Sequence, residues 1–357
     1  MSESKIRILV VDDSALMRRI LQNLLEMDPE IEVIGSAKDG LDALAKAKEL
    51  QPDLVTLDVE MPVMDGFTCL ENLQKQGTYG VVMVSSFSRE GEFATIRALE
   101  QGAIDFILKP ENVFNMSDEM KRSEIIDKIK VAYRNFKKAE KIRKIEKKPT
   151  ERPLLTFGTG GNQLKYIIAI GVSTGGPRAL STIMPEFPAD LPAAIVVVQH
   201  MPPGFTRSLA VRLNENSRLS VKEAEEDDEL KPGHAYVAPG NIHFTFAEGT
   251  YPPRVRLVNG PPVGGFRPSV DGMMNSLARS RAENFIGVIM TGMGSDGSKG
   301  LQNLKQTKKN TYILAQDEST SIVYGMPRTA VELGIVDEVV PLHDIPKSIM
   351  KYMGVRR

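Results

Sequence analysis

Cysteine is almost absent from this sequence, which has one in 357 residues. An internal disulfide is therefore excluded, and Cys69, in the helix-like segment FTCLENL, is predicted to fill the core. No apolar run approaches the roughly 18–20 residues that span a bilayer, and the N-terminal one is too short for a secretory signal. Lysine and arginine (45) nearly balance aspartate and glutamate (46). These features predict a cytoplasmic protein without membrane insertion and without a nucleic-acid partner.

The order of apolar segments predicts two α/β domains. Over residues 6–135, five short β-rich runs alternate with segments whose apolar residues have helical spacing, a pattern typical of a doubly wound parallel sheet. A second set of buried-looking strands begins at Tyr166. Short extended runs over about residues 219–270 predict a β-hairpin insertion in this second α/β sheet.

The segment between the two sets of strands differs in composition. Residues 137–148 contain seven Lys/Arg and two Glu, and a stretch with Pro, Thr and Gly follows. We interpret it as a basic helical extension and a flexible linker rather than a nucleic-acid arm. The sequence thus predicts a first domain at 1–136, a linker at 137–164 and a second domain at 165–357.

Acidic and phosphate-binding side chains follow the predicted strands of the first domain. They are Asp12, Asp13, Asp58, Ser85 and Lys109. The carboxyl ends of parallel strands form one crevice, where three carboxylates need a counter-ion such as Mg²⁺. In such a site Asp58 could attack phosphorus while Ser85 and Lys109 stabilise the phosphoryl oxygens. Helix capping, a common use of aspartate, explains only one or two of these positions.

The motifs VVDDS, TLDVEMPVMDG, VSS and LKP closely resemble the receiver domain of two-component response regulators. The resemblance covers about residues 6–135 and implies a flavodoxin-like fold in which Asp58 is the phospho-acceptor. It implies a Mg²⁺ site formed by Asp12, Asp13, Asp58 and the backbone carbonyl of Glu60. It also implies that Ser85, where many receivers have threonine, and Lys109 contact the phosphoryl group, with a chemotaxis histidine kinase as phosphodonor.

In the second domain, the segment GVSTG around Ser173 fits the G-x-S-x-G pattern, in which a strand-to-helix turn presents a serine. Alone the pattern is ambiguous, because glycine-rich strand–helix turns also bind phosphates. Of the four histidines, only His200 ends a buried predicted strand and so shares the sheet edge of Ser173. Asp296, in a glycine-rich turn after a third buried strand, could orient His200, although Asp-Gly is also a common turn. The Met293 and Gly294 amides of that turn could face an oxyanion.

The segments IGVSTGGPRAL, VVVQHMPPGFT, MTGMGSDGSKGL and QDESTSIVYGMPRTAVELG, after a receiver, resemble the CheB family of chemotaxis response-regulator protein-glutamate methylesterases over nearly all of the chain except the linker. The resemblance implies a Rossmann-like esterase domain with a triad of Ser173, His200 and Asp296. It implies that Thr174 and Met293 line the site and that the ester chemistry needs no cofactor. The implied substrates are glutamate γ-methyl esters on methyl-accepting chemoreceptors, and many relatives also deamidate receptor glutamines.

The order of the domains predicts control by occlusion, in which the unphosphorylated receiver covers the crevice and phosphorylation exposes it. Two alternatives remain at this point. The GVSTGGP loop could bind a phosphate or nucleotide in a non-catalytic module, although the paired His200 and Asp296 argue against it. A DNA-binding output is disfavoured by the near-zero net charge and by the lack of a helix-turn-helix pattern.

Overall fold

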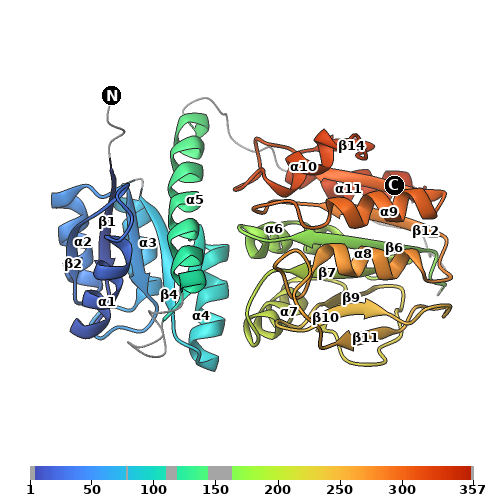
Figure 1. Cartoon of the computed structure of the whole chain (residues 1–357). Helices are drawn as coiled ribbons and strands as arrows, with labels where there is room; N and C mark the ends of the chain where they lie inside the picture. Colours follow the sequence, from blue (N-terminus) through green and yellow to red (C-terminus); the bar gives the residue numbers. More distant parts are fainter. Residues whose placement is uncertain (1–4, 78, 110–118, 144–162, 355–357) are drawn as a thin grey trace. The chain divides into compact units, whose positions relative to one another are not determined.

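The structure is a computed structural model that describes residues 5–77, 79–109, 119–143 and 163–354. The chain forms two compact units, Met1–Glu146 and Lys147–Arg357, each built around its own parallel sheet (Figure 1). Most of the segment predicted as a linker lies outside the described residues, so the domain limits stay a prediction. Within the described part of the chain, no helix is long and apolar enough to cross a bilayer.

The first unit is a five-stranded sheet with the order β2-β1-β3-β4-β5, and all its strand pairs are parallel. The strands are Ile6–Val11 (β1), Ile31–Ala37 (β2), Leu54–Asp58 (β3), Gly80–Ser85 (β4) and Asp105–Leu108 (β5). The helices are Ala15–Leu25 (α1), Gly40–Leu50 (α2), Gly66–Gln76 (α3), Arg89–Glu100 (α4) and Glu119–Arg143 (α5). Strands β3 and β4 are buried along their whole length, as expected where helices cover both faces of a sheet. The predicted doubly wound fold is confirmed.

Helices α1 to α4 begin at side-chain caps. Ser14, Asp39, Asp65 and Ser88 each accept a hydrogen bond from a backbone amide of the first helical turn, which satisfies a donor that has no partner within the helix. None of these caps is one of the three aspartates predicted to hold a metal. Helix capping therefore does not explain those three carboxylates.

The second unit is a seven-stranded sheet with the order β14-β13-β12-β6-β7-β9-β8, and its strand pairs are also parallel. The strands are Tyr166–Val172 (β6), Ala193–Gln199 (β7), Ser220–Glu223 (β8), His234–Val237 (β9), Asn284–Ile289 (β12), Asn310–Gln316 (β13) and Glu338–Val340 (β14). The α-helices are Gly176–Ile183 (α6), Phe205–Asn216 (α7), Val270–Ala278 (α8), Ser298–Thr307 (α9), Met326–Glu332 (α10) and Ile345–Tyr352 (α11). Short 3₁₀ helices occupy Met184–Glu186 and Leu342–Asp344.

The predicted hairpin insertion is present as strands β10 (His243–Phe246) and β11 (Val255–Val258), which pair antiparallel. The predicted range of the insertion, about residues 219–270, also includes His234, and there the prediction is wrong, because His234 begins β9 and that strand pairs in parallel with β7 and β8 of the main sheet. The following residues of β9 are buried, whereas β11 is only partly buried. Strands β9 and β11 both have four residues, so burial and not length distinguishes the strand of the main sheet from the strand of the hairpin.

The predicted core position of Cys69 is confirmed, because its side chain is fully buried in the first unit. Burial raises the pKa of this thiol to about 12, with smaller contributions from the charges of Asp65 and Asp39. The thiolate is the reactive form of cysteine. Cys69 is therefore a packing residue rather than a nucleophile.

Candidate active site

Three carboxylates and a lysine meet at the carboxyl edge of the first sheet. Asp12 and Asp13 follow β1, Asp58 ends β3, and oxygen atoms of the three lie within 4.8 Å of one another. Lys109, which follows β5, places its Nζ 2.7 Å from Asp58 Oδ2 and 3.1 Å from Asp12 Oδ2. The predicted cluster is thus brought together by parallel strands that end at one edge.

The charges of this cluster are not balanced by protein groups alone. Burial, together with the charge of Asp12, raises the pKa of Asp58 to about 6, although Lys109 and the Glu60 amide act to lower it. Asp12 Oδ2 is buried, and its contact within the described part of the chain is the 3.1 Å ion pair with Lys109 Nζ. A hard divalent cation with oxygen ligands would supply the missing positive charge and use that oxygen. These residues therefore fit Mg²⁺.

Ser85 and Glu60, the other two residues predicted for this site, lie beside the acid cluster. Ser85 Oγ accepts from Thr95 Oγ1 at 2.9 Å and donates toward the Gly91 carbonyl at 3.3 Å. The Glu60 backbone amide donates to Asp58 Oδ1 at 3.3 Å. Of these neighbours, Thr95 was not foreseen from the sequence, because only the fold brings α4 against the end of β4.

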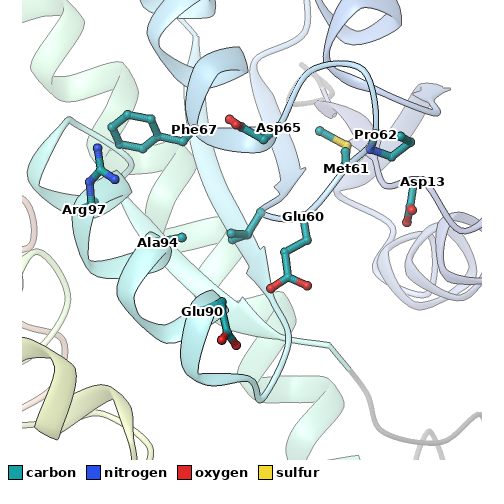
Figure 2. Close-up of a pocket in the computed structure, with 10 residues that line it drawn as sticks. Asp13, Glu60, Met61, Pro62, Asp65, Phe67, Glu90, Ala94 and Arg97 are labelled. Carbon is teal, nitrogen blue, oxygen red and sulfur yellow. The ribbon is translucent and has the colours of Figure 1, made fainter.

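A cavity of about 490 Å³ adjoins the acid cluster. Its polar and aromatic lining residues are Asp13, Glu60, Asp65, Phe67, Glu90 and Arg97 (Figure 2). The guanidinium carbon of Arg97 lies 4.4 Å from the centre of the Phe67 ring, a cation–π contact that holds the arginine on the cavity wall. Since Asp13 and Glu60 belong to the predicted metal site, that site is accessible from this cavity.

In the second unit, Ser173 and His200 occupy adjacent strand ends. Val172 of β6 is the register partner of Gln199 of β7, so the next residues, Ser173 and His200, leave the sheet side by side. The His200 amide donates to the Val172 carbonyl at 3.2 Å, and the Ser173 amide donates to the Thr291 carbonyl at 3.0 Å. Backbone pairing on both flanks therefore fixes where the serine turn begins.

His200 is held by Asp296, as the sequence predicts. His200 Nε2 lies 2.8 Å from Asp296 Oδ2. An ionised carboxylate only accepts hydrogen bonds, so Nε2 carries the proton and the lone pair of the neutral ring is at Nδ1. His200 Nδ1 is buried and has no hydrogen-bond partner among the described residues. The ring thus presents an unpaired basic nitrogen at the end of the strand next to Ser173.

Asp296 is itself fixed at the N-terminus of helix α8. The Val270 and Asp271 amides and the Ser269 hydroxyl donate to its carboxylate at 2.7–2.9 Å. Burial acts to raise the pKa of Asp296, but the hydrogen bonds from His200 and these amides outweigh it and hold the pKa below 3.8. The carboxylate is therefore ionised and oriented before any substrate binds.

Phe266 covers one face of the histidine and was missed by the sequence analysis. The two rings stack with centroids 4.1 Å apart and planes 8° apart. Phe266 ends a tight turn in which Val263 and Phe266 exchange two backbone hydrogen bonds of 3.0 Å. The following Arg267 anchors this loop by donating to Asn241 Oδ1 and to the Gly260 carbonyl. Only an aromatic residue in a glycine-rich segment, VGGFRP, hinted at this contact.

Thr174 is part of the serine turn, and Met293 belongs to the loop that packs against it. The Thr174 carbonyl accepts from Thr291 Oγ1 at 2.9 Å. A Cβ added to Gly292 would lie 2.8 Å from the Ser173 Cβ, so this glycine lets the following residue, Met293, approach the serine. Met293 is 45% exposed, and its amide makes no backbone hydrogen bond within the described ranges. That N–H is free to donate to a substrate oxygen.

These features define the class of protein. A receiver-type unit with an acidic pocket at its sheet edge is joined to an α/β unit whose sheet edge carries a serine, a histidine and a carboxylate, the set used by serine hydrolases. The chain order of the three differs from that of α/β-hydrolases. The second unit therefore carries this set of residues on a different topology.

Comparison with known proteins identifies the family. The model of the response regulator receiver domain matches residues 8–121, and that of the CheB methylesterase matches residues 168–349. The protein-glutamate methylesterase/protein-glutamine glutaminase of Pyrococcus horikoshii is 45% identical, over 99% of this chain and 95% of its own. That of Symbiobacterium thermophilum is 47% identical, over 98% of this chain and 97% of its own. The crystal structure of the Thermotoga maritima CheB methylesterase catalytic domain is 42% identical and covers 54% of this chain and 98% of its own, with a TM-score of 0.49. On the family models and the two relatives, this chain belongs to the CheB methylesterase family.

Proposed function

We propose that this chain is a phosphorylation-regulated serine esterase that hydrolyses glutamate γ-methyl esters on methyl-accepting chemotaxis receptors. The same site deamidates receptor glutamines, since an amide passes through the same acyl-enzyme. Relatives that match nearly the whole chain carry both activities in their names. The observation that carries the proposal is the 2.8 Å contact between His200 Nε2 and Asp296 Oδ2, which leaves Nδ1 buried and without a hydrogen-bond partner among the described residues, at the end of the strand next to that of Ser173.

Acylation begins when Ser173 Oγ attacks the γ-carbonyl carbon and its proton passes to His200 Nδ1. The imidazolium that forms is stabilised through Nε2 by Asp296, which stays a carboxylate. The Met293 amide donates to the tetrahedral oxyanion, and such donors contribute about 10²–10³-fold in rate. As the C–O bond to the leaving group breaks, His200 returns its proton, and methanol is released from an ester or ammonia from a glutamine.

Deacylation repeats these steps with water. His200 Nδ1 removes a proton from water as its oxygen attacks the acyl carbon, and the bond to Ser173 Oγ breaks with return of that proton to the serine. The product is a free glutamate side chain. Proton transfers, the oriented imidazole and backbone donors account for every step, and all of these groups lie at one sheet edge.

Asp58 is the proposed phospho-acceptor of the first unit, with a chemotaxis histidine kinase as phosphodonor. Mg²⁺, when bound by Asp12, Asp13, Asp58 and the Glu60 carbonyl, supplies positive charge to the phosphoryl oxygens. Lys109 already contacts Asp58 at 2.7 Å, so phosphorylation replaces a carboxylate–lysine pair by a phosphoryl–lysine pair. Repositioning of Lys109 and Ser85 is the local event that would signal the new charge.

A non-catalytic loop that binds a phosphate or nucleotide is not favoured. Such a loop needs backbone amides and positive charge, whereas here Asp296 brings a buried negative charge to His200 at the same edge. Family membership over nearly the whole chain argues in the same direction. The catalytic interpretation accounts for both observations.

The direct test is methanol release from methylated receptor fragments by the full chain and by Ser173→Ala. We expect the variant to lose at least about 10³-fold in kcat, because the acyl-enzyme cannot form. Ammonia release from glutamine-containing fragments is expected to fall with it. Retention of either activity by Ser173→Ala would contradict the proposed nucleophile, and circular dichroism checks that the variant is folded.

A further inference from the structure

The side chain of Gln199 contacts the backbone of both Ser173, the proposed nucleophile, and His200, the proposed base. It ends strand β7, directly before His200, and is 1% exposed. Its Nε2 donates to two backbone carbonyls, that of Ser173 at 3.0 Å and that of His200 at 3.1 Å. A carboxamide nitrogen has two protons, so both donors are used. One planar side chain thus fixes the two carbonyls relative to each other.

The carbonyl oxygen of the Gln199 side chain, unlike its nitrogen, makes no hydrogen bond among the described residues. This oxygen, Oε1, is buried. An unpaired buried acceptor costs stability, and an apolar side chain of the same length would avoid that cost. A Cβ added to Gly176 would also overlap Oε1, so a second residue is constrained by this glutamine. A purely packing role would impose neither requirement.

The next carbonyl of the serine turn is held from the opposite flank. Thr291 follows β12, and its Oγ1 donates to the Thr174 carbonyl at 2.9 Å. The Thr291 amide donates in turn to Oε1 of the buried Gln316 at 2.9 Å. Side chains that follow or end the two neighbouring strands, Thr291 and Gln199, therefore fix consecutive carbonyls of the turn. Of these two side chains, Gln199 also donates to the His200 carbonyl.

We propose that Gln199 is a positioning residue for the hydrolytic reaction. By holding the carbonyls of Ser173 and His200 together, it sets the distance from Ser173 Oγ to His200 Nδ1 without touching the substrate. Proton transfer requires hydrogen-bond distance, and a displacement of about 1 Å can cost about 10²-fold in rate. The inference rests on the proposed function, since it takes Ser173 as the nucleophile.

The test uses the full chain with Gln199→Met, which has similar length and volume but lacks both N–H donors. We expect kcat for methanol release to fall by about 10²-fold with KM unchanged. The rate at which an organophosphonate labels Ser173 is expected to fall by a similar factor. The midpoint of the pH–rate profile is expected to stay in place, because Asp296 still holds His200. If Gln199→Met does not fold, Gln199→Leu replaces it; this smaller apolar side chain also lacks both donors, and the same fall is expected.

The matched control is Thr311→Val, which removes a buried hydroxyl bond to the Lys308 carbonyl at the other end of the sheet. It is expected to lower the melting temperature but not kcat. A Gln199 variant that keeps the wild-type rate below its own melting temperature would overturn the positioning role. Ser173→Ala is measured in parallel. Activity in Ser173→Ala contradicts the proposed function itself, whereas an inactive Ser173→Ala beside a fully active Gln199→Met contradicts only the role of Gln199.

Discussion

At the scale of single residues, the orientation of His200 decides the chemistry. Because Asp296 occupies Nε2, the proposed base is Nδ1, and the carboxylate needs to be ionised to hold that tautomer. The hydrogen bonds from His200 and from the first turn of α8 keep the pKa of Asp296 below 3.8 despite its burial. Asp296 therefore stays charged over the pH range in which imidazoles titrate.

Asp296→Asn is expected to lower kcat by about 10³–10⁴-fold, because the amide no longer selects the tautomer with a proton on Nε2. The variant is also expected to be less stable than the wild type. A depressed pKa contributes stability above the unfolded value of 3.8, and this is lost as the pH falls through the folded value. Urea unfolding across pH measures the difference, which should shrink toward acid. A pH-independent difference would contradict the assignment.

The aromatic ring of Phe266 is expected to contribute to the rate of hydrolysis by stacking on His200. Phe266→Leu removes the stacked contact with His200 and is expected to lower kcat by about 2- to 10-fold, since aromatic pairs contribute about 0.5–1.5 kcal/mol beyond burial. Phe266→Tyr keeps the ring and is the matched control, with kcat near that of the wild type. Steady-state methanol release distinguishes the two variants. Equal loss in both would show that the stack does not position the imidazole.

At the scale of elements, helices α8 and α9 exchange caps. Asp296, just before α9, accepts from the first amides of α8. Asp271, in the first turn of α8, accepts from the amides of Gly297, the residue before α9, and of Gly300 in the first turn of α9. Each helix N-terminus thus holds the other's carboxylate. This exchange places Asp296 before His200 by means of two helices rather than a flexible loop.

Asp271→Ala is expected to destabilise the chain by about 0.5–2 kcal/mol, the usual cost of losing a cap. Asp271→Asn keeps an acceptor and is expected to cost less. Burial raises the pKa of Asp271, as does the charge of Asp296, while amide hydrogen bonds oppose the rise. The charged form is thus penalised, and the cost of Asp271→Asn relative to the wild type shrinks as the pH rises above 3.8. Calorimetry at several pH values measures both variants, and an Asn variant as unstable as Ala would contradict this account.

Sequence patterns predict the parts of this structure that depend on strand ends. The acid cluster around Asp58 and the pairing of His200 with Asp296 follow once the strands are known to be parallel, because their carboxyl ends share an edge. The stacking of Phe266 and the cap by Asp271 depend on how loops return to that edge, which no local pattern encodes. Strand β9 was misassigned because short β-rich runs look alike until their neighbours are known.

At the scale of the whole molecule, each unit has its own sheet and its own buried core. The order of the units predicts that the unphosphorylated first unit restrains the second. Deleting residues 1–150 is therefore expected to raise basal methanol release by about 5-fold or more, the lower end of typical coupling between sites. Circular dichroism verifies that the remaining unit is folded. An unchanged or lower rate would argue for another mode of control.

The account's central claim is that Ser173 performs hydrolysis under control of the phosphorylation of Asp58. The most direct measurement is methanol release from methylated receptor fragments with and without a small-molecule phosphodonor and Mg²⁺, by the wild type, Asp58→Asn and Ser173→Ala. We predict stimulation of the wild type, an unstimulated basal rate in Asp58→Asn, and no hydrolysis by Ser173→Ala under either condition. Stimulation of Asp58→Asn equal to that of the wild type, or hydrolysis by Ser173→Ala, would contradict the account.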